Sequence, residues 1–155
     1  IYTRFGDKSG LFSAVVKPAA DGLMEIYLGS ISEASVCGSA NTAIDMGGDG
    51  TEQVLKYIYD NLDAFRLIFC NSAGTEYEDY FDRLAETEEK FYREFVRKYA
   101  KEPQKISDFF IHVVCRTRWQ YVFEVVSHDI PYEEAQGFMK SIREYSFAGW
   151  KRVME

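Results

Sequence analysis

Hydrophobic residues recur with the period of an α-helix along most of this chain. The first long stripe starts at Asp7, a suitable N-cap, and continues to Ala34. Pro18 lies inside the stripe, which keeps its phase across the proline. A proline in a helix interior removes one backbone hydrogen bond and bends the helix. We therefore expect one long helix with a kink at Pro18.

The pattern changes in residues 35–50, which are small and polar and include four glycines. Because no period persists there, we expect a loop. Helical spacing resumes at Thr51 and is interrupted near Asn61. This interruption predicts two short helices that meet at Asn61.

Two further helix starts are marked by capping residues. Thr75 is followed three residues later by Glu78, which is the pattern of a capping box, and the helix it predicts ends before Pro103. Asp129 and Pro131, followed by acidic residues, predict the start of a last helix in the order of cap, proline and first-turn acids.

The stretch 106–128 is unusually apolar: 13 of its 23 residues are hydrophobic and they occupy nearly every angle around a helix axis. Such a helix is buried on more than one side. The last helix, 131–155, also carries a broad apolar stripe. Together these two helices expose more hydrophobic surface than one small bundle covers, so we expect a two-fold homodimer that packs them as a four-helix bundle.

The expected dimer contacts lie along the stripe of the last helix. They are Phe138, Ile142, Tyr145 and Gly149. A glycine in a helix costs about 1 kcal/mol relative to alanine, and close approach of a partner backbone would explain Gly149. Fraying of the helix end is the alternative explanation.

Composition supports one all-α domain. The chain has 155 residues with 11 glycines and 3 prolines, too few for a sandwich of many short strands. No apolar run approaches the roughly 20 residues that span a bilayer, and the N-terminus lacks a secretion signal. We therefore expect a cytoplasmic protein with no membrane partner.

Signals of catalysis and metal binding are weak. The three cysteines are far apart, and neither a disulfide framework nor a metal-ligand spacing is present. Glu124 and His128 are four residues apart, whereas helical di-iron sites use Glu-x-x-His. The sequence MGGDG lacks the lysine of a phosphate-binding loop. We expect no catalytic residues, metal or cofactor, and keep a helical-bundle enzyme or metal-binding protein as the alternative function.

Aromatic residues make up 16% of the chain, and those in its middle could wall a cavity that takes an apolar or aromatic small molecule. The candidate ligand-binding residues are Phe69, Phe81, Phe109, His112, Arg116 and Trp119. The guanidinium of Arg116 would favour an anionic group on the ligand. The equally weighted alternative is an ordinary aromatic core with an internally paired polar strip, such as Asp108 with His112.

Charge is distributed unevenly. The net charge is −7, the wrong sign for a surface that binds nucleic acid over its whole extent. Residues 1–17, however, contain three basic side chains against one acidic side chain. Because the first residue is Ile1 and not methionine, we expect a fragment from which a preceding basic module is missing.

The opening sequence IYTRFGDKSGLFSAVV resembles the TetR family of bacterial transcriptional regulators. In that family a tyrosine, an aromatic residue, a small turn, a lysine and a Leu-Phe pair mark the join of the recognition helix and the next helix. Tyr2, Phe5, Gly6, Lys8 and the pair at 11–12 occupy those places. The closing sequence EEAQGFMKSIREYSFAGWKRVME is similar to the last helix of many members.

The resemblance implies an all-α, ligand-responsive regulator, most often a repressor. Residues 1–6 would end a truncated helix-turn-helix, and residues 7–155 would form the ligand-binding and dimerisation domain. Tyr2 and Lys8 match positions that touch phosphates of operator DNA, and Thr3 lies at the end of the recognition helix. The effector would be a small molecule, and the helix containing Pro18 would tilt when it binds.

Overall fold

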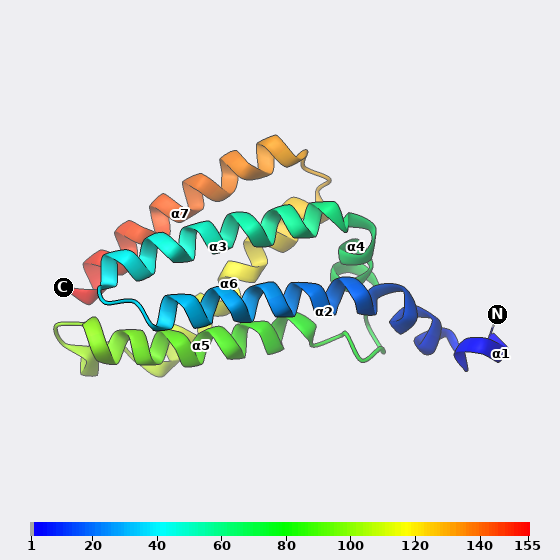
Figure 1. The fold of residues 1–155 in the computed structure, drawn as a ribbon, viewed down its shortest axis with the longest axis horizontal. Coiled ribbons are helices and arrows are strands. Elements are labelled where there is room, and N and C mark those ends of the chain that lie inside the picture. Colours follow the sequence, from blue (N-terminus) through cyan, green and yellow to red (C-terminus); the bar gives the residue numbers. More distant parts are fainter. Residues whose placement is uncertain (1) are drawn as a thin grey trace.

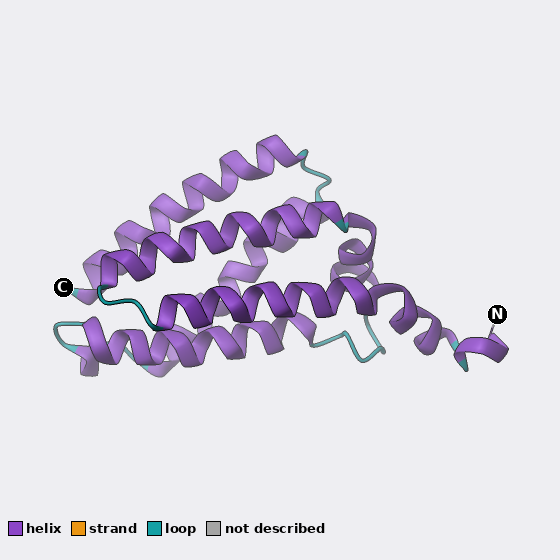
Figure 2. Ribbon diagram, in the orientation of Figure 1, coloured by secondary structure: helices purple, strands orange, loops and turns teal. Residues whose placement is uncertain are grey.

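The computed structural model describes residues 2–155, apart from the side chains of Tyr2, Ala40 and residues 42–49. Throughout this range the regular elements are helices, so the predicted all-α bundle is confirmed (Figure 2). The helices are α1 (Tyr2–Phe5), α2 (Lys8–Ser35), α3 (Ala40–Asp60), α4 (Leu62–Asn71), α5 (Tyr80–Tyr99), α6 (Asp108–Ser127) and α7 (Tyr132–Met154). A short 3-10 helix, Pro103–Lys105, joins α5 to α6.

The long helices form an elongated bundle. In Figure 1, α3, α2 and α5 lie side by side along the long axis, and α6 crosses behind them. α2 packs against α3, α4 and α5, whereas α6 packs against α4 and α5. α7 contacts α3 and slants across the remaining side. α1 projects from one end of the bundle, and the C-terminus lies at the other end.

The core lies between α2, α3, α4, α5 and α6. The largest fully buried side chains are Phe65, Leu23, Ile58, Ile68, Leu84 and Ile111. Along α7, all of whose residues are described, only Ala135 is buried. α7 therefore contributes Ala135 to the core and otherwise covers the bundle from outside.

The long predicted helix is confirmed as α2. The Asp7 side chain accepts a hydrogen bond from the backbone N–H of Gly10 at 2.8 Å, which caps the first turn. Pro18 lies within the helix, and in Figure 1 the first turns of α2 leave the line of the rest. The backbone after the proline is held from outside: the hydroxyls of Tyr57 and Tyr80 donate to the carbonyls of residues 19 and 20, at 3.1 and 2.6 Å.

A glycine allows α3 to approach α2 closely. A Cβ placed on Gly22 would lie 2.0 Å from the Tyr57 hydroxyl oxygen, which is far inside contact distance. The hydrogen bond from Tyr57 to α2 therefore depends on the absence of a side chain at position 22.

The predicted loop at residues 35–50 is wrong over most of its length, because α3 begins at Ala40. Each glycine in a helix costs about 1 kcal/mol, but tertiary packing can exceed that cost. Gly50 is buried against α2, where its Cβ would lie 3.0 Å from the Ser30 side chain. The predicted division at Asn61 is confirmed, and its side-chain amide donates to the Tyr57 carbonyl at 2.9 Å.

The predicted capping box does not start a helix, since α5 begins at Tyr80. Instead, the Glu78 carboxylate accepts from the backbone N–H of Gly74 at 2.9 Å, and the Thr75 hydroxyl donates to the Ser72 carbonyl at 2.7 Å. These bonds close a turn in which Gly74 has φ +78°. The turn also brings Tyr77 into the core.

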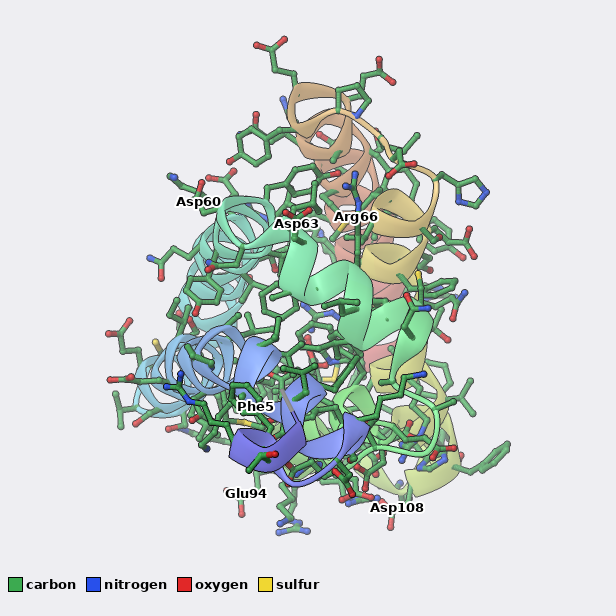
Figure 3. All side chains as sticks on the ribbon, turned by 90° about the vertical axis from the view of Figure 1, so that its right-hand side faces the viewer. Phe5, Asp60, Asp63, Arg66, Glu94 and Asp108 are labelled. Atoms are coloured by element: carbon green, nitrogen blue, oxygen red, sulfur yellow. The ribbon has the colours of Figure 1, made fainter. Side chains whose placement is uncertain are left out.

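Asp129 was expected to cap the last helix, but Pro131 holds the N-cap position of α7. Asp129 has a left-handed backbone with φ 54° and instead forms an ion pair with Arg66 of α4 at 2.6 Å. Arg66, labelled in Figure 3 beside Asp63, thus ties the α6–α7 connection to α4. No helix in the described part of the chain is long and apolar enough to cross a membrane.

Candidate ligand-binding site

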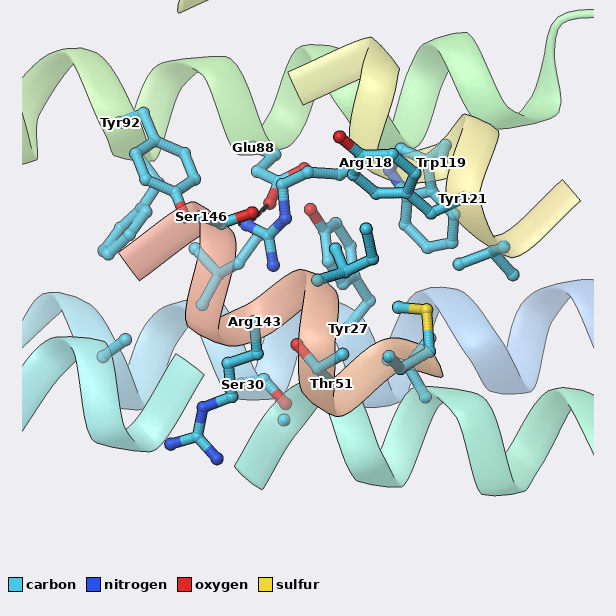
Figure 4. A pocket seen from close by; sticks show the side chains of 18 of the residues that line it. Tyr27, Ser30, Thr51, Glu88, Tyr92, Arg118, Trp119, Tyr121, Arg143 and Ser146 are labelled. Carbon is cyan, nitrogen blue, oxygen red and sulfur yellow. Dashed lines mark hydrogen bonds and ion pairs between the residues drawn. The ribbon is translucent and has the colours of Figure 1, made fainter. Parts of the chain in front are cut away.

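A cavity of about 170 Å³ lies inside the bundle and is lined by α2, α3, α5, α6 and α7 (Figure 4). Its lining is mostly apolar and aromatic. Two of the helices present residues at spacings of three, four and seven positions, which lie on one helix face. They are Tyr27, Ser30, Ile31 and Ala34 of α2, and Glu88, Phe91, Tyr92 and Phe95 of α5.

The other three helices complete the lining of the cavity, which stays partly open to solvent. The residues of α3 and α6 are Gly50, Thr51, Val54, Arg118, Trp119, Tyr121 and Val122. Those of α7 are Met139, Ile142, Arg143, Ser146, Phe147 and Trp150. The Trp150 ring stacks on Tyr92 of α5 with centroids 4.9 Å apart, which closes one end of the cavity. α7 therefore forms the outer wall.

A buried ion pair occupies the polar part of the wall. Glu88 is only 4% exposed and accepts a hydrogen bond from the Arg118 guanidinium. The same Arg118 nitrogen donates to the Tyr92 hydroxyl at 2.7 Å. About a third of the Arg118 side chain, 32%, remains exposed. A buried carboxylate is costly without such a partner, so the pair keeps Glu88 compatible with the bundle interior.

The protonation of this cluster is set by burial. Burial raises the pKa of Glu88, and the nearby charge of Arg118 opposes part of that rise. Burial also raises the pKa of Tyr92 to about 12. The pKa of Tyr27 lies well above its ordinary value, first because of burial and then because of the Glu88 charge. Both tyrosines are therefore neutral at physiological pH.

Among the described cavity-lining side chains, the Trp119 indole nitrogen is buried without a hydrogen-bond partner. The Trp119 and Tyr27 rings meet edge to face with centroids 5.3 Å apart. The Tyr27 hydroxyl interacts with the Glu88 carboxylate, which raises the pKa of Tyr27 and acts to lower the pKa of Glu88. A buried donor such as the Trp119 N–H is normally satisfied by protein, water or ligand.

Of the six predicted ligand-binding residues, Trp119 lines this cavity and the other five lie elsewhere. Phe69 and Phe81 stack on each other with centroids 3.9 Å apart, and Phe81 also contacts Trp119 at 5.4 Å. They fill the core behind the cavity wall. Phe109 is 74% exposed near the start of α6.

His112 and Arg116 belong to a different cluster, centred on the buried carboxylate of Glu89. Arg116 donates a hydrogen bond to Glu89, His112 Nδ1 lies 3.0 Å from it, and Arg93 donates to it at 3.0 Å. Burial acts to raise the pKa of Glu89, but Arg116 and the other cations outweigh burial and lower it. Arg116 is therefore engaged with a carboxylate of this chain and does not face the cavity.

The predicted dimer residues lie on two sides of α7. Ile142 lines the cavity. Phe138, Tyr145 and Gly149 are exposed, with Tyr145 at 73%, and nothing lies within 4 Å of a Cβ placed on Gly149. The close contact expected at Gly149 is therefore not made within this chain.

At the N-terminal end, Thr3 and Lys8 are exposed on α1 and at the start of α2. The side chain of Tyr2, the third predicted DNA contact, lies outside the described residues. The turn between the helices uses Gly6 at φ +82°. A Cβ on Gly10 would lie 2.0 Å from the Phe5 carbonyl oxygen, so a second glycine lets α1 pack against α2.

Glu88 and Arg118 are the functional candidates that sequence reasoning missed. Glu88 is the first residue of its four-membered stripe on α5, in which the others are aromatic. In α6, every fourth residue from Asp108 is polar, and Arg118 does not belong to this series. The sequence could have indicated both residues, because each is a charged residue on the apolar side of its helix.

The described residues contain no group of three or more His, Cys, Asp or Glu side chains that could hold a metal ion. Comparisons with protein-family models, with curated proteins and with solved structures find no match to this chain.

Proposed function

We propose that this chain is the ligand-binding and dimerisation domain of a DNA-binding transcriptional regulator of the TetR type, most often a repressor, which acts in the cytoplasm. The proposal starts from the sequence resemblance at residues 2–12. It is supported by the local geometry there: a short helix, a turn at Gly6 and a capped long helix.

The observation that carries the proposal is the course of α2. This helix begins at Lys8, beside α1 at the projecting end of the bundle, and passes Tyr27 and Ile31 in the cavity wall. One continuous element therefore joins the segment that would bind operator DNA to the site that would bind an effector. A ligand that moves the wall at Tyr27 would act directly on the position of α1.

The proposed homodimer uses the outer surfaces of α6 and α7. Phe110 and Val113 of α6 and Phe138 and Tyr145 of α7 are exposed large hydrophobic side chains. Exposed apolar surface of this extent marks interaction sites in many proteins. A two-fold pair would cover these residues with their own copies and set the spacing of two DNA-binding ends.

Operator binding by the full-length protein tests the proposal. We expect fluorescence anisotropy to detect binding to DNA from its own upstream region, with affinity that falls as salt rises. Lys8→Ala should weaken binding and reduce the salt dependence, since phosphate contacts dominate this term. Lys56→Ala, which removes an exposed lysine paired with Asp60 on α3, is the control. Absent or salt-insensitive binding would contradict the proposal.

A further inference from the structure

The charges of the cavity wall cancel. Glu88 and Arg118 pair with each other, so the polar part of the wall has one negative and one positive group in contact. Arg143 also lines the cavity, but Figure 4 shows its guanidinium directed away from this pair. Among the described residues, the interior therefore offers no unpaired charge to a ligand.

A charged ligand that binds one member of the pair would lie beside the other member, which has the same sign of charge as the ligand. An anion placed against Arg118 would lie beside the Glu88 carboxylate, and a cation placed against Glu88 would lie beside the guanidinium. Both arrangements also require the ligand to leave water for a mainly aromatic interior, which is unfavourable for an ion. The wall selects against charged molecules.

The wall does contain a donor that lacks an acceptor. Trp119 is 7% exposed, and its indole nitrogen has no hydrogen-bond partner. An indole N–H donates and cannot accept. An acceptor oxygen on a bound molecule would satisfy this group, whereas the Tyr27 hydroxyl already interacts with the Glu88 carboxylate.

The size of the cavity limits the ligand. Its volume is about 170 Å³, and an engineered apolar cavity of about 150 Å³ is known to hold benzene. One aromatic ring with a small substituent fits this space. Phe91, Tyr92 and Trp150 supply ring surfaces that suit such a molecule.

We propose that the cavity binds an uncharged molecule with one aromatic ring and a carbonyl or ether oxygen, which accepts a hydrogen bond from Trp119. This inference rests on the proposed function in taking the cavity as the effector site. It replaces the anionic ligand that the sequence suggested through Arg116, because Arg116 binds Glu89 outside the cavity.

Four ring compounds of similar size test the charge and the acceptor separately. They are acetophenone, α-methylstyrene, benzoate and benzylammonium. Calorimetric titration of the full-length protein should show acetophenone binding at least about threefold more tightly than α-methylstyrene, its isostere without an acceptor, because a net hydrogen bond has about this effect. Benzoate and benzylammonium should bind more weakly than both.

Variants then identify the donor. Trp119→Phe should reduce the preference for acetophenone over α-methylstyrene by about three- to tenfold. This ratio isolates the hydrogen bond, because a change of cavity shape affects both compounds. Tyr99→Phe removes a hydroxyl that donates to the Cys37 carbonyl away from the cavity, and it should leave the ratio unchanged.

Each outcome decides a part of the inference. Tighter binding of benzoate or benzylammonium would overturn the uncharged ligand. Equal binding of acetophenone and α-methylstyrene, or a ratio unaffected by Trp119→Phe, would overturn the acceptor. No binding of any compound at millimolar concentration would overturn the one-ring ligand. The operator-binding assay reports on the proposed function independently of these results.

Discussion

At the scale of single residues, two adjacent glutamates on α5 differ in their surroundings. Glu88 faces the cavity and Arg118, whereas Glu89 faces a cluster of Arg93, His112 and Arg116. Both carboxylates are buried, yet the pKa of Glu88 is raised and that of Glu89 is lowered. The difference arises because burial outweighs the single arginine beside Glu88, whereas the arginines beside Glu89 outweigh burial.

Removal of one member of the Glu88–Arg118 pair should destabilise the protein. We expect Glu88→Gln to cost about 3 kcal/mol, the lower end of the range for a broken buried pair, because Arg118 keeps part of its surface open. Arg118→Met should cost less, since a buried carboxyl can take up a proton and a guanidinium cannot release one. Urea unfolding measures both.

The exposed neighbour Glu86 provides the control for this comparison. Glu86→Gln should change the free energy of unfolding by less than about 0.5 kcal/mol, as surface substitutions usually do. A cost below about 1 kcal/mol for Glu88→Gln would contradict a stabilising role for the pair.

Glu89 should make stability depend on acid pH. Its folded pKa is lowered from 4.5, so its contribution is present above that value and is lost as the pH falls through the folded pKa. The wild type should therefore lose more stability between pH 6 and pH 3 than Glu89→Gln does. Thermal unfolding across this range, with Glu86→Gln as the control, measures the difference. Parallel pH profiles for wild type and Glu89→Gln would count against it.

At the scale of elements, α2 is the helix that connects the other parts of the molecule. It contacts α3, α4 and α5 and lines the cavity. The tyrosine hydroxyls from α3 and α5 reach its backbone just after Pro18. The segment beyond the proline is thus fixed to the bundle, whereas the first turns lead to α1.

Gly22 and Gly29 of α2 should respond in opposite ways to alanine. Gly22→Ala places a Cβ against the Tyr57 hydroxyl and should cost about 1–3 kcal/mol by overpacking. Gly29→Ala has nothing within 4 Å of the new Cβ and should stabilise the helix by about 0.5–1 kcal/mol. Equilibrium unfolding of the pair tests this packing, and equal effects would mean that α3 does not approach α2 as closely as described.

Pro18 should affect the coupling between ligand and DNA. If the bend acts as a hinge, Pro18→Ala should preserve both affinities and reduce the effect of ligand on operator binding, a coupling typically about 1–3 kcal/mol. Operator affinity of the full-length variant with and without saturating ligand measures this coupling. An unchanged coupling would leave a static bend that only fits α2 to the core.

At the scale of the whole molecule, we propose that the outer surfaces of α6 and α7 form the dimer interface. We expect sedimentation to show a dimer at micromolar concentration, with an interface on the order of 2,000 Å² or more. Gly149→Glu should yield monomers because it places a charge where two helices meet. Gly29→Glu makes the same substitution on α2, away from that surface, and should leave the dimer intact. A monomeric wild type, or a dimeric Gly149→Glu, would refute the assembly.

Local patterns in the sequence determined the helices. The cap at Asp7, the continuous stripe across Pro18 and the division at Asn61 all appear as predicted. Each of these signals involves residues within a few positions of one another, and hydrogen bonds and helix spacing act over that range. The start of α3 at Ala40 escaped prediction because its glycines are compensated by packing against α2.

Tertiary structure alone decided the site. Helical spacing places a residue on a face but does not say which helix that face meets. In the folded protein, Arg116 binds Glu89, and Phe69 stacks on Phe81. Arg118, two residues further along α6, instead binds Glu88 in the cavity wall. Two residues correspond to more than half a turn, so the direction that each arginine takes depends on the neighbouring helices.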